Sequence, residues 1–153
     1  MPTHHQGTPQ EELALNTYIK LTRATDAVLS DLYPGGKLHG LTPSQFGTLE
    51  ALYHLGEMCQ GEIGEKILRS SGNMTLVIVN LEKRGLVRRQ RDKNDRRQIN
   101  VNLTNAGRAF VKKTFPTHVA DILERFSLLS PQEQETLGRL LKKLGGPHTG
   151  SPK

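Results

Sequence analysis

The chain has 153 residues, which is enough for one domain with a core of its own and too few for two independent domains. Hydrophobic residues make up 35% and Trp is absent, so Leu, Ile and Val must build the core, a composition that favours packed helices. No apolar run approaches the roughly 20 residues that span a bilayer, and residues 1–12 lack an apolar signal-peptide core. The single Cys excludes an internal disulfide framework. We therefore expect a cytoplasmic protein of mainly helical class.

The charge of the chain is basic. Its 21 Lys and Arg residues against 15 Asp and Glu give a formal net charge of +6, with an isoelectric point near 9.7. The excess is concentrated in residues 82–97, where eight cations face three anions, a net charge of +5. Such a segment indicates an anionic partner, although an isolated basic run is usually a solvated face. The predicted elements around residues 82–97 are needed to distinguish a binding surface for an anionic partner from a solvated face.

Capping residues predict four helix starts. At three of them a hydroxyl side chain is followed by Pro and, three residues on, by Glu or Gln: residues 8–11, 42–45 and 130–133. Thr104 caps the fourth start. Apolar residues at helical spacing follow each start, and we expect them to face the core. They are Leu13, Ile19, Leu21 and Val28; Phe46, Leu49, Leu52 and Tyr53; Phe110, Val111, Val119, Ile122 and Leu123; and Leu137, Leu140, Leu141 and Leu144.

Between residues 60 and 104 the predicted elements are shorter. Residues 60–68 form a helix, and after a tight turn Ser70 is a good N-cap for a second helix over residues 71–84. Gly85 ends that helix in the left-handed cap position. Residues 86–91 and 97–103 have strand character, and the polar turn 92–96 joins them. The segment therefore predicts a helix-turn-helix followed by a basic β-hairpin, the wing.

This arrangement is typical of a protein that reads the major groove of DNA with its second helix. Asn73 can bond adenine with two hydrogen bonds, Ser71 and Thr75 can meet bases or phosphates, and Leu76 can touch a thymine methyl group. The alternative is that Ser71 and Asn73 merely occupy an exposed helix start, where both residue types are favoured. The wing favours DNA, since its cations can reach phosphates and a narrow minor groove. These cations are Arg88, Arg89, Arg91, Lys93, Arg96 and Arg97.

The same residues resemble the multiple-antibiotic-resistance regulator (MarR) family of bacterial winged helix-turn-helix transcription factors. The matching stretches are LTPSQF at residues 41–46, QGEI at 60–63, SSGNMT at 70–75, NLEKRGLVRR at 80–89 and DRRQINVNLT at 95–104. The resemblance covers about residues 10–144. One departure is the apolar run at residues 76–79, where relatives often carry polar residues on this helix. It bears on the base sequence that is read, not on the mode of binding.

The resemblance implies a single domain at about residues 10–144, between disordered tails at 1–9 and 145–153. Its winged-helix lobe would span about residues 42–104, and dimerisation helices would span about 10–33 and 104–144. A symmetric homodimer would bind a pseudo-palindromic operator in double-stranded DNA, usually as a repressor. In this family pattern Asp95 braces the wing while Arg97 enters the minor groove.

The resemblance also implies a release mechanism, either a small aromatic or phenolic effector or the oxidation of a cysteine. Lys20 and Arg23 are candidates to attract an anionic effector. Cys59 precedes the third helix at its N-cap, where a helix dipole can lower the pKa of a thiol; the alternative is an inert small hydrophobe. The six His residues show no metal-ligand spacing with Cys59, so no metal and no cofactor is expected.

Two other classes of function are alternatives to DNA binding. A winged helix can serve as a protein-binding or RNA-binding module, because the fold alone does not fix the function. An enzyme is not expected, since the sequence has no nucleophile–base pair, phosphate-cradling Gly loop or paired-carboxylate signature.

Overall fold

The computed structural model describes residues 2–67 and 71–146, with the side chains of Ser71, Gly72 and Asn73 left out. The expected cap Ser70 therefore lies outside the described residues, and so do the side chains of Ser71 and Asn73. The chain divides into two compact units, up to His118 and from Val119 onward. The boundary falls inside one long helix, α5 (Asn105–Phe126).

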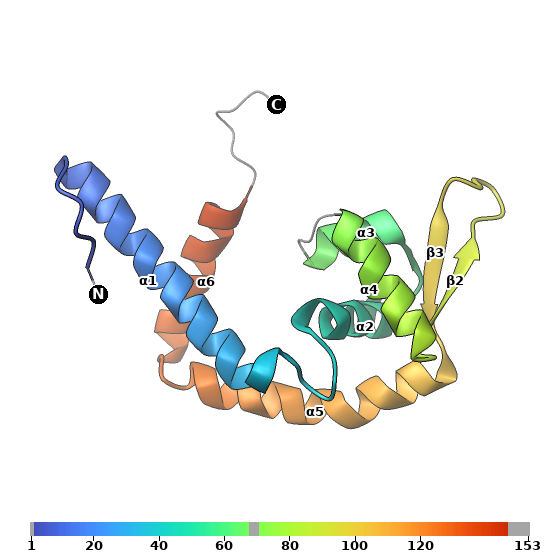
Figure 1. The fold of residues 1–153 in the computed structure, drawn as a ribbon. Helices are drawn as coiled ribbons and strands as arrows, with labels where there is room; N and C mark the ends of the chain where they lie inside the picture. Colours follow the sequence, from blue (N-terminus) through green and yellow to red (C-terminus); the bar gives the residue numbers. More distant parts are fainter. Residues whose placement is uncertain (1, 68–70, 147–153) are drawn as a thin grey trace. The chain divides into compact units, whose positions relative to one another are not determined.

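The first unit is built in the order helix, helix-turn-helix, hairpin and helix (Figure 1). Its elements are α1 (Pro9–Leu32), η1 (Pro34–Gly36), α2 (Pro43–Leu55), β1 (Met58–Cys59), α3 (Gln60–Ile67), α4 (Ser71–Lys83), β2 (Val87–Arg91), β3 (Ile99–Leu103) and the first part of α5. The second unit holds the end of α5 and α6 (Pro131–Gly145). A mainly helical fold with a small β-hairpin wing is confirmed. Each described helix is too short or too polar to cross a lipid bilayer.

The predicted helix starts are present, each with its capping hydrogen bonds. Thr8, Thr42 and Ser130 each accept from the backbone N–H three residues on, and the Glu or Gln at that position accepts from the cap's own N–H. At the fourth start the hydroxyl of Thr104 accepts from Gly107 N at 3.0 Å and donates to Gly85 O at 2.6 Å. Caps of this kind are worth about 1 kcal/mol each, which explains why the chain starts its helices there.

The helix-turn-helix contributes a large part of the core of the first unit. The buried face of α4 is the one that the spacing predicts, since Met74, Val77, Ile78 and Leu81 are all buried. Fully burying such a side chain contributes roughly 1.5–3 kcal/mol, so this face fixes the rotation of α4 about its axis. The side chains that pack around it from the other elements are also buried: Leu41, Phe46, Leu49, Leu52, Ile63, Val87, Val101 and Val111.

The three strands form one antiparallel sheet in the order β1-β3-β2. Val87 pairs with Leu103 and Arg91 with Ile99, which sets the register of the hairpin. The strand β1 was not predicted, because two residues are too short to show alternation; its Met58 pairs with Val101. The hairpin extends away from the helices of the first unit (Figure 1).

Both predicted strands and the second short helix are shorter than predicted, while the predicted end of the first short helix at residue 68 lies outside the described residues. Leu86 belongs to the turn that closes α4 and not to the strand, because its N–H donates to Leu81 O at 3.0 Å across Gly85, whose φ is +74°. Such a left-handed cap closes a helix by drawing the next residue into its last turn. Gln98 belongs to the wing turn, because its N–H donates to Asp95 O at 3.0 Å. The turn therefore occupies residues 92–98 rather than 92–96.

One expectation about the core is wrong. Several residues of the apolar stripes on α1, α5 and α6 are exposed, although we expected them to face the core. Leu123 of α5 is 70% exposed and Leu144 of α6 is 65% exposed. An apolar stripe at helical spacing indicates that this face of the helix is covered in the working protein. It does not indicate whether the same chain or another chain covers it. The other exposed members are Leu13, Val119, Leu140 and Leu141.

Candidate nucleic-acid interface

The face of α4 that lies opposite its buried side chains is open to solvent. Thr75 and Leu76 are exposed near the start of the helix and Lys83 is exposed at its end. The hydroxyl of Thr75 accepts a hydrogen bond from Gln60 Nε2 at 2.7 Å, which ties the start of α3 to α4. Gln60 is a positioning residue that sequence reasoning missed, since its partner lies 15 residues away. One side-chain hydrogen bond thus connects the start of this face to the preceding helix.

The wing turn is organised around Asp92. Its Oδ1 accepts from Asn94 N at 2.7 Å and from Asp95 N at 3.0 Å, and its Oδ2 accepts from Asn100 Nδ2 at 3.0 Å. The hydrogen bond from Asn100 is the largest cause that lowers the pKa of Asp92 below its ordinary value, followed by the two backbone N–H groups. The sequence indicated only Asp95 as a brace, whereas Asp92 makes more of the hydrogen bonds that shape the turn.

This arrangement predicts an acid-sensitive wing. Because the folded-state pKa of Asp92 lies below its ordinary value of 3.8, the carboxylate stabilises the turn at higher pH. That contribution disappears as the pH falls from 3.8 through the lower folded-state pKa. We expect the amides of Asn94 and Asp95 to lose protection in NMR exchange spectra over this range before the amide of Val101 does. The Asp92→Asn variant is the control, and a pH dependence that persists in it would assign the effect to another group.

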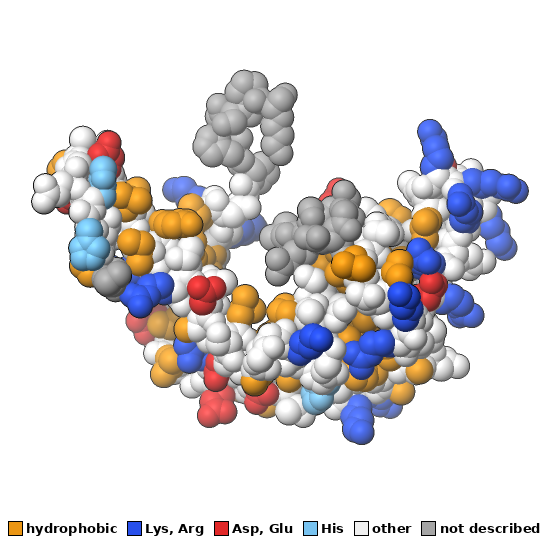
Figure 2. All heavy atoms as spheres, viewed as in Figure 1, with side chains coloured by type: hydrophobic (Ala, Val, Ile, Leu, Met, Phe, Trp, Pro, Cys, Tyr) orange, Lys and Arg blue, Asp and Glu red, His pale blue; other side chains and the backbone are white. Residues whose placement is uncertain are grey.

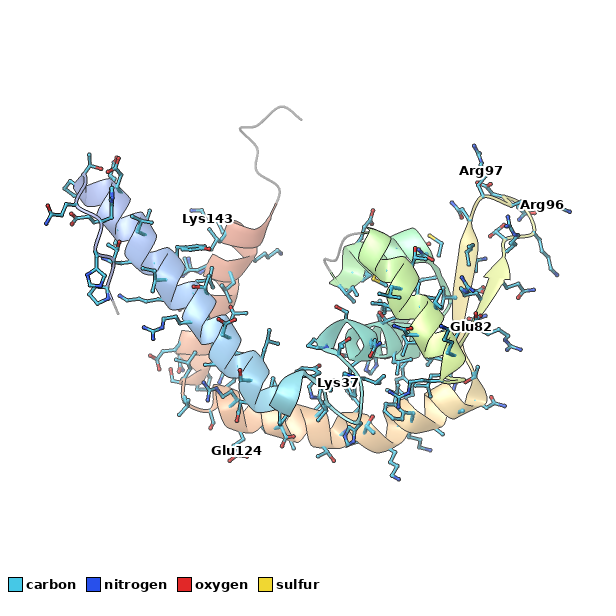
Figure 3. The ribbon with its side chains drawn as sticks, viewed as in Figure 1. Lys37, Glu82, Arg96, Arg97, Glu124 and Lys143 are labelled. Carbon is cyan, nitrogen blue, oxygen red and sulfur yellow. The ribbon has the colours of Figure 1, made fainter. Side chains whose placement is uncertain are left out.

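Asp95 and Arg97 form a second contact inside the wing. Asp95 Oδ1 accepts from Arg97 N at 3.0 Å and from Arg97 Nε at 3.3 Å. The side chain of Arg97 is nevertheless 93% exposed, so Asp95 contacts only the Nε edge of the guanidinium group and the rest of that group faces solvent. Figure 3 shows Arg96 and Arg97 at the tip of the hairpin, directed away from the helices of this unit.

Arg89 has a different environment from the other wing arginines. Glu82 of α4 accepts from Arg89 N and Arg89 Nε, both at 3.1 Å, and pairs with Arg89 Nη2 at 3.0 Å. The side-chain hydrogen bond from Arg89 is the largest cause that lowers the pKa of Glu82. Glu82 lies where α4 and β2 approach one another (Figure 3). Arg89 therefore fixes the wing to α4 and is less available to a ligand than its neighbours.

The remaining wing cations make one exposed basic surface, which we call the wing patch. Blue side chains gather on the hairpin in Figure 2. Arg91 is partly engaged, since its Nη1 donates to Arg96 O at 2.9 Å, while the other members extend into solvent. The wing patch consists of Arg88, Arg91, Lys93, Arg96 and Arg97.

The candidate sensing residues lie in separate places. Lys20 and Arg23 are exposed on α1. Cys59 lies in β1, directly before α3, and is partly exposed; its N–H donates to Glu62 Oε1 at 3.5 Å. Within residues 2–67 and 71–146, no three His, Cys, Asp or Glu side chains are grouped so as to hold a metal ion. The structure does not bring Lys20 and Arg23 together with Cys59.

A buried aromatic cluster was not singled out from the sequence. The ring of His118 on α5 lies 4.7 Å from the ring of Phe46 on α2 and 5.6 Å from that of Tyr33, at the end of α1. All three side chains are buried. Burial raises the pKa of Tyr33, and Glu50 adds to the shift. His118 occurs in a part of α5 that also holds Lys113, Thr117 and Asp121, so its burial was not evident from its neighbours in the sequence.

The chain matches known proteins along most of its length. Residues 41–99 match the model of the MarR family. The uncharacterized helix-turn-helix (HTH)-type transcriptional regulator YkoM of Bacillus subtilis (strain 168) is 40% identical over 88% of this chain and 87% of YkoM. The HTH-type transcriptional regulator MhqR of the same strain is 37% identical over 88% of this chain and 92% of MhqR.

Solved structures share the fold. Bordetella bronchiseptica BpsR, whose DNA binding is regulated by 6-hydroxynicotinic acid, superposes with a TM-score of 0.76 at 27% identity, over 85% of this chain and 98% of BpsR. S. aureus MepR, solved in complex with DNA, superposes with a TM-score of 0.73 at 25% identity, over 83% of this chain and 95% of MepR. With the matched residues 41–99 and the relatives that it resembles over most of its length, the chain belongs to the MarR family, a family of transcriptional regulators.

Proposed function

We propose that this chain represses transcription as a homodimer that binds a pseudo-palindromic DNA operator and is released by a small-molecule effector. The observation that carries the proposal is the placement of the wing patch beside the open face of α4, joined by the contact between Glu82 and Arg89. A helix of this kind fits the major groove, and an exposed arginine at the tip of a wing fits the narrower minor groove. The cations of the wing patch, together with Lys83 at the end of α4, complement the phosphates.

Some candidate DNA contacts are supported by the structure and others by the sequence alone. Thr75 and Leu76 are exposed on α4, and Arg88, Lys93, Arg96 and Arg97 are exposed on the wing. Arg89, Asp92 and Asp95 support the wing from within by the hydrogen bonds given above. The roles of Ser70, Ser71 and Asn73 rest on the sequence alone.

The exposed apolar faces support the homodimer. Leu123 and Leu144 belong to α5 and α6, and a groove of about 420 Å³ on the second unit is lined by Leu129, Leu137 and Leu140. Large apolar side chains that several positions of one compact unit leave exposed or partly exposed, three of them around one groove, indicate an interaction site. A second copy of the chain is the partner that offers the same surface in return, as two-fold symmetry requires.

The homodimer predicts a specific effect of charge on α5. Leu123→Glu would place two unpaired carboxylates in the interface, and we expect the dimer dissociation constant to rise about tenfold, because buried unpaired charges are costly. Sedimentation equilibrium measures the change. Leu55→Glu is the matched control, since Leu55 is 60% exposed at the end of α2 in the winged-helix lobe. Equal association constants for both variants would place the dimer interface elsewhere.

A small aromatic effector fits the family and the composition of the first unit. BpsR responds to 6-hydroxynicotinic acid, and a further MarR-fold structure, NadR, is in complex with 4-hydroxyphenylacetate. In this chain Tyr33, Phe46 and His118 supply aromatic rings, and Lys20 and Arg23 supply positive charge on α1. We propose an aromatic acid as the chemical class of effector. Oxidation of Cys59 is the alternative trigger, supported by its partial exposure.

The proposal is tested by selecting bound sequences from random duplex DNA and measuring affinity for the selected duplex. We expect an enriched palindromic sequence that is bound much more tightly than random duplex or RNA. The logarithm of the binding constant should fall with the logarithm of salt concentration by roughly 0.9 for each phosphate contact. Equal affinity for the selected duplex, random duplex and RNA would contradict the proposal and favour a protein-binding module. Aromatic acids are then screened for release of the selected duplex.

A further inference from the structure

Among the described side chains on the outward face of α4, Leu76 and Val79 are apolar, where a DNA-reading helix usually carries polar groups. Leu76, Val79 and Lys83 follow one another at intervals of three and four residues, so they lie on one face of the helix. That face is opposite the buried row that contains Met74, Ile78 and Leu81. Leu76 is 62% exposed, Val79 is half-buried and Lys83 is exposed. The sequence of side chains along this face is thus leucine, valine and then a cation.

The polar neighbour of Leu76 is already engaged. The hydroxyl of Thr75 accepts from Gln60 at 2.7 Å, which occupies one of its two acceptor positions. Neither Leu76 nor Val79 has a hydrogen-bond donor or acceptor in its side chain, so neither can use the polar code of the base edges. A single exposed leucine needs no explanation on an ordinary surface. Here it lies on the open face of α4, next to Thr75, on the surface proposed to meet DNA.

Only one group on the base edges of the major groove suits such a face. The C5-methyl of thymine is the apolar group that unmodified DNA presents there, and leucine contacts it by dispersion and by exclusion of water. We propose that α4 reads thymine C5-methyl groups through Leu76, with Val79 supporting Leu76 and Lys83 neutralising a nearby phosphate. This inference rests on the proposed function and deepens it, because it names the chemical group that sets the base preference.

Uracil supplies the decisive test, because deoxyuridine keeps the base pairing and the O4 acceptor of thymidine and lacks only the methyl group. Each thymine of the selected operator is replaced singly by deoxyuridine, and affinities are measured by fluorescence anisotropy at fixed salt. Removing one buried methyl group is expected to weaken binding about fourfold at the position that Leu76 contacts. Replacing the symmetry-related thymine as well should weaken binding by roughly tenfold or more.

Two variants identify the residue responsible. Leu76→Ala shortens an exposed side chain, so the fold is kept, and its affinity should become insensitive to deoxyuridine at that one position while other positions are unchanged. Lys83→Gln is the matched control, and it should weaken binding to the thymine and uracil operators by the same factor. Indifference of the unmodified protein to every deoxyuridine would overturn the inference, as would full sensitivity retained in Leu76→Ala.

Failure of the inference and failure of the proposed function give different results. If the chain enriches an operator and deoxyuridine has no effect, DNA binding stands and methyl recognition is wrong. If no duplex is enriched over random DNA, the proposed function is wrong and the inference is overturned with it.

Discussion

Replacing Arg97 by Ala is expected to weaken operator binding by about 1–3 kcal/mol, the largest effect that we expect for a single wing residue. At the tip of the wing, Arg97 donates from both its backbone N and its guanidinium Nε to one carboxylate oxygen, Asp95 Oδ1. Its 93% exposed side chain is therefore presented to a ligand with less conformational freedom to lose on binding. An oriented guanidinium in a narrow minor groove gains from the concentrated negative potential there.

The controls separate orientation from charge. Lys112→Ala removes one exposed positive charge from α5. It should lower the affinity for the operator only by the small loss of general, salt-dependent attraction to the DNA phosphates. Arg97→Lys keeps the charge and loses the planar fork, so it should recover only part of the affinity. Asp95→Ala should weaken binding when Arg97 is present and have little further effect in Arg97→Ala, because the two residues act as one unit. Unchanged affinity of Arg97→Ala in anisotropy measurements would exclude the wing tip from the interface.

The local features of this fold were predictable because they depend on neighbours in the sequence. Thr8, Thr42 and Ser130 cap helices through residues only three positions away, and Gly85 ends α4 by its own backbone conformation. The burial of the α4 face also followed from spacing alone. In the wing, the family resemblance implied that Asp95 braces the hairpin, and its hydrogen bonds to Arg97 span only two residues.

The contacts that position the candidate interface depend on the fold, and sequence reasoning did not find them. Glu82 meets Arg89 only because α4 and β2 come together after the turn at Gly85. Gln60 meets Thr75 only because α3 packs against α4. The exposed stripe on α5 and α6 shows a further limit, since periodicity at Leu123 cannot tell whether the same chain or a second copy covers it.

The junction between the wing and α5 depends on Gly107. A Cβ built on Gly107 would overlap the backbone carbonyl oxygen of Leu86 and would lie 3.2 Å from Leu103 Cδ2. That carbonyl already accepts from Thr104 N at 3.1 Å, and Thr104 also caps α5 through Gly107 N. Since the carbonyl belongs to the main chain that closes the wing, it cannot move aside like the end of a flexible side chain. The start of α5 is therefore fixed by direct contact of two backbones.

Gly107→Ala is accordingly expected to lower the free energy of unfolding by about 1–3 kcal/mol, in the range of other overpacked sites. In an open helix the same change would stabilise by up to about 1 kcal/mol, because Ala is the better helix former. Gly138 on α6 provides that comparison, since no atom lies within 4 Å of its added Cβ. Both variants are unfolded in urea at the same protein concentration, so that any contribution of dimerisation to stability is equal. The changes in the free energy of unfolding should have opposite signs. Stabilisation by Gly107→Ala would show that α5 can move away from Leu86 at no cost, and that the wing is not fixed to α5 by this contact.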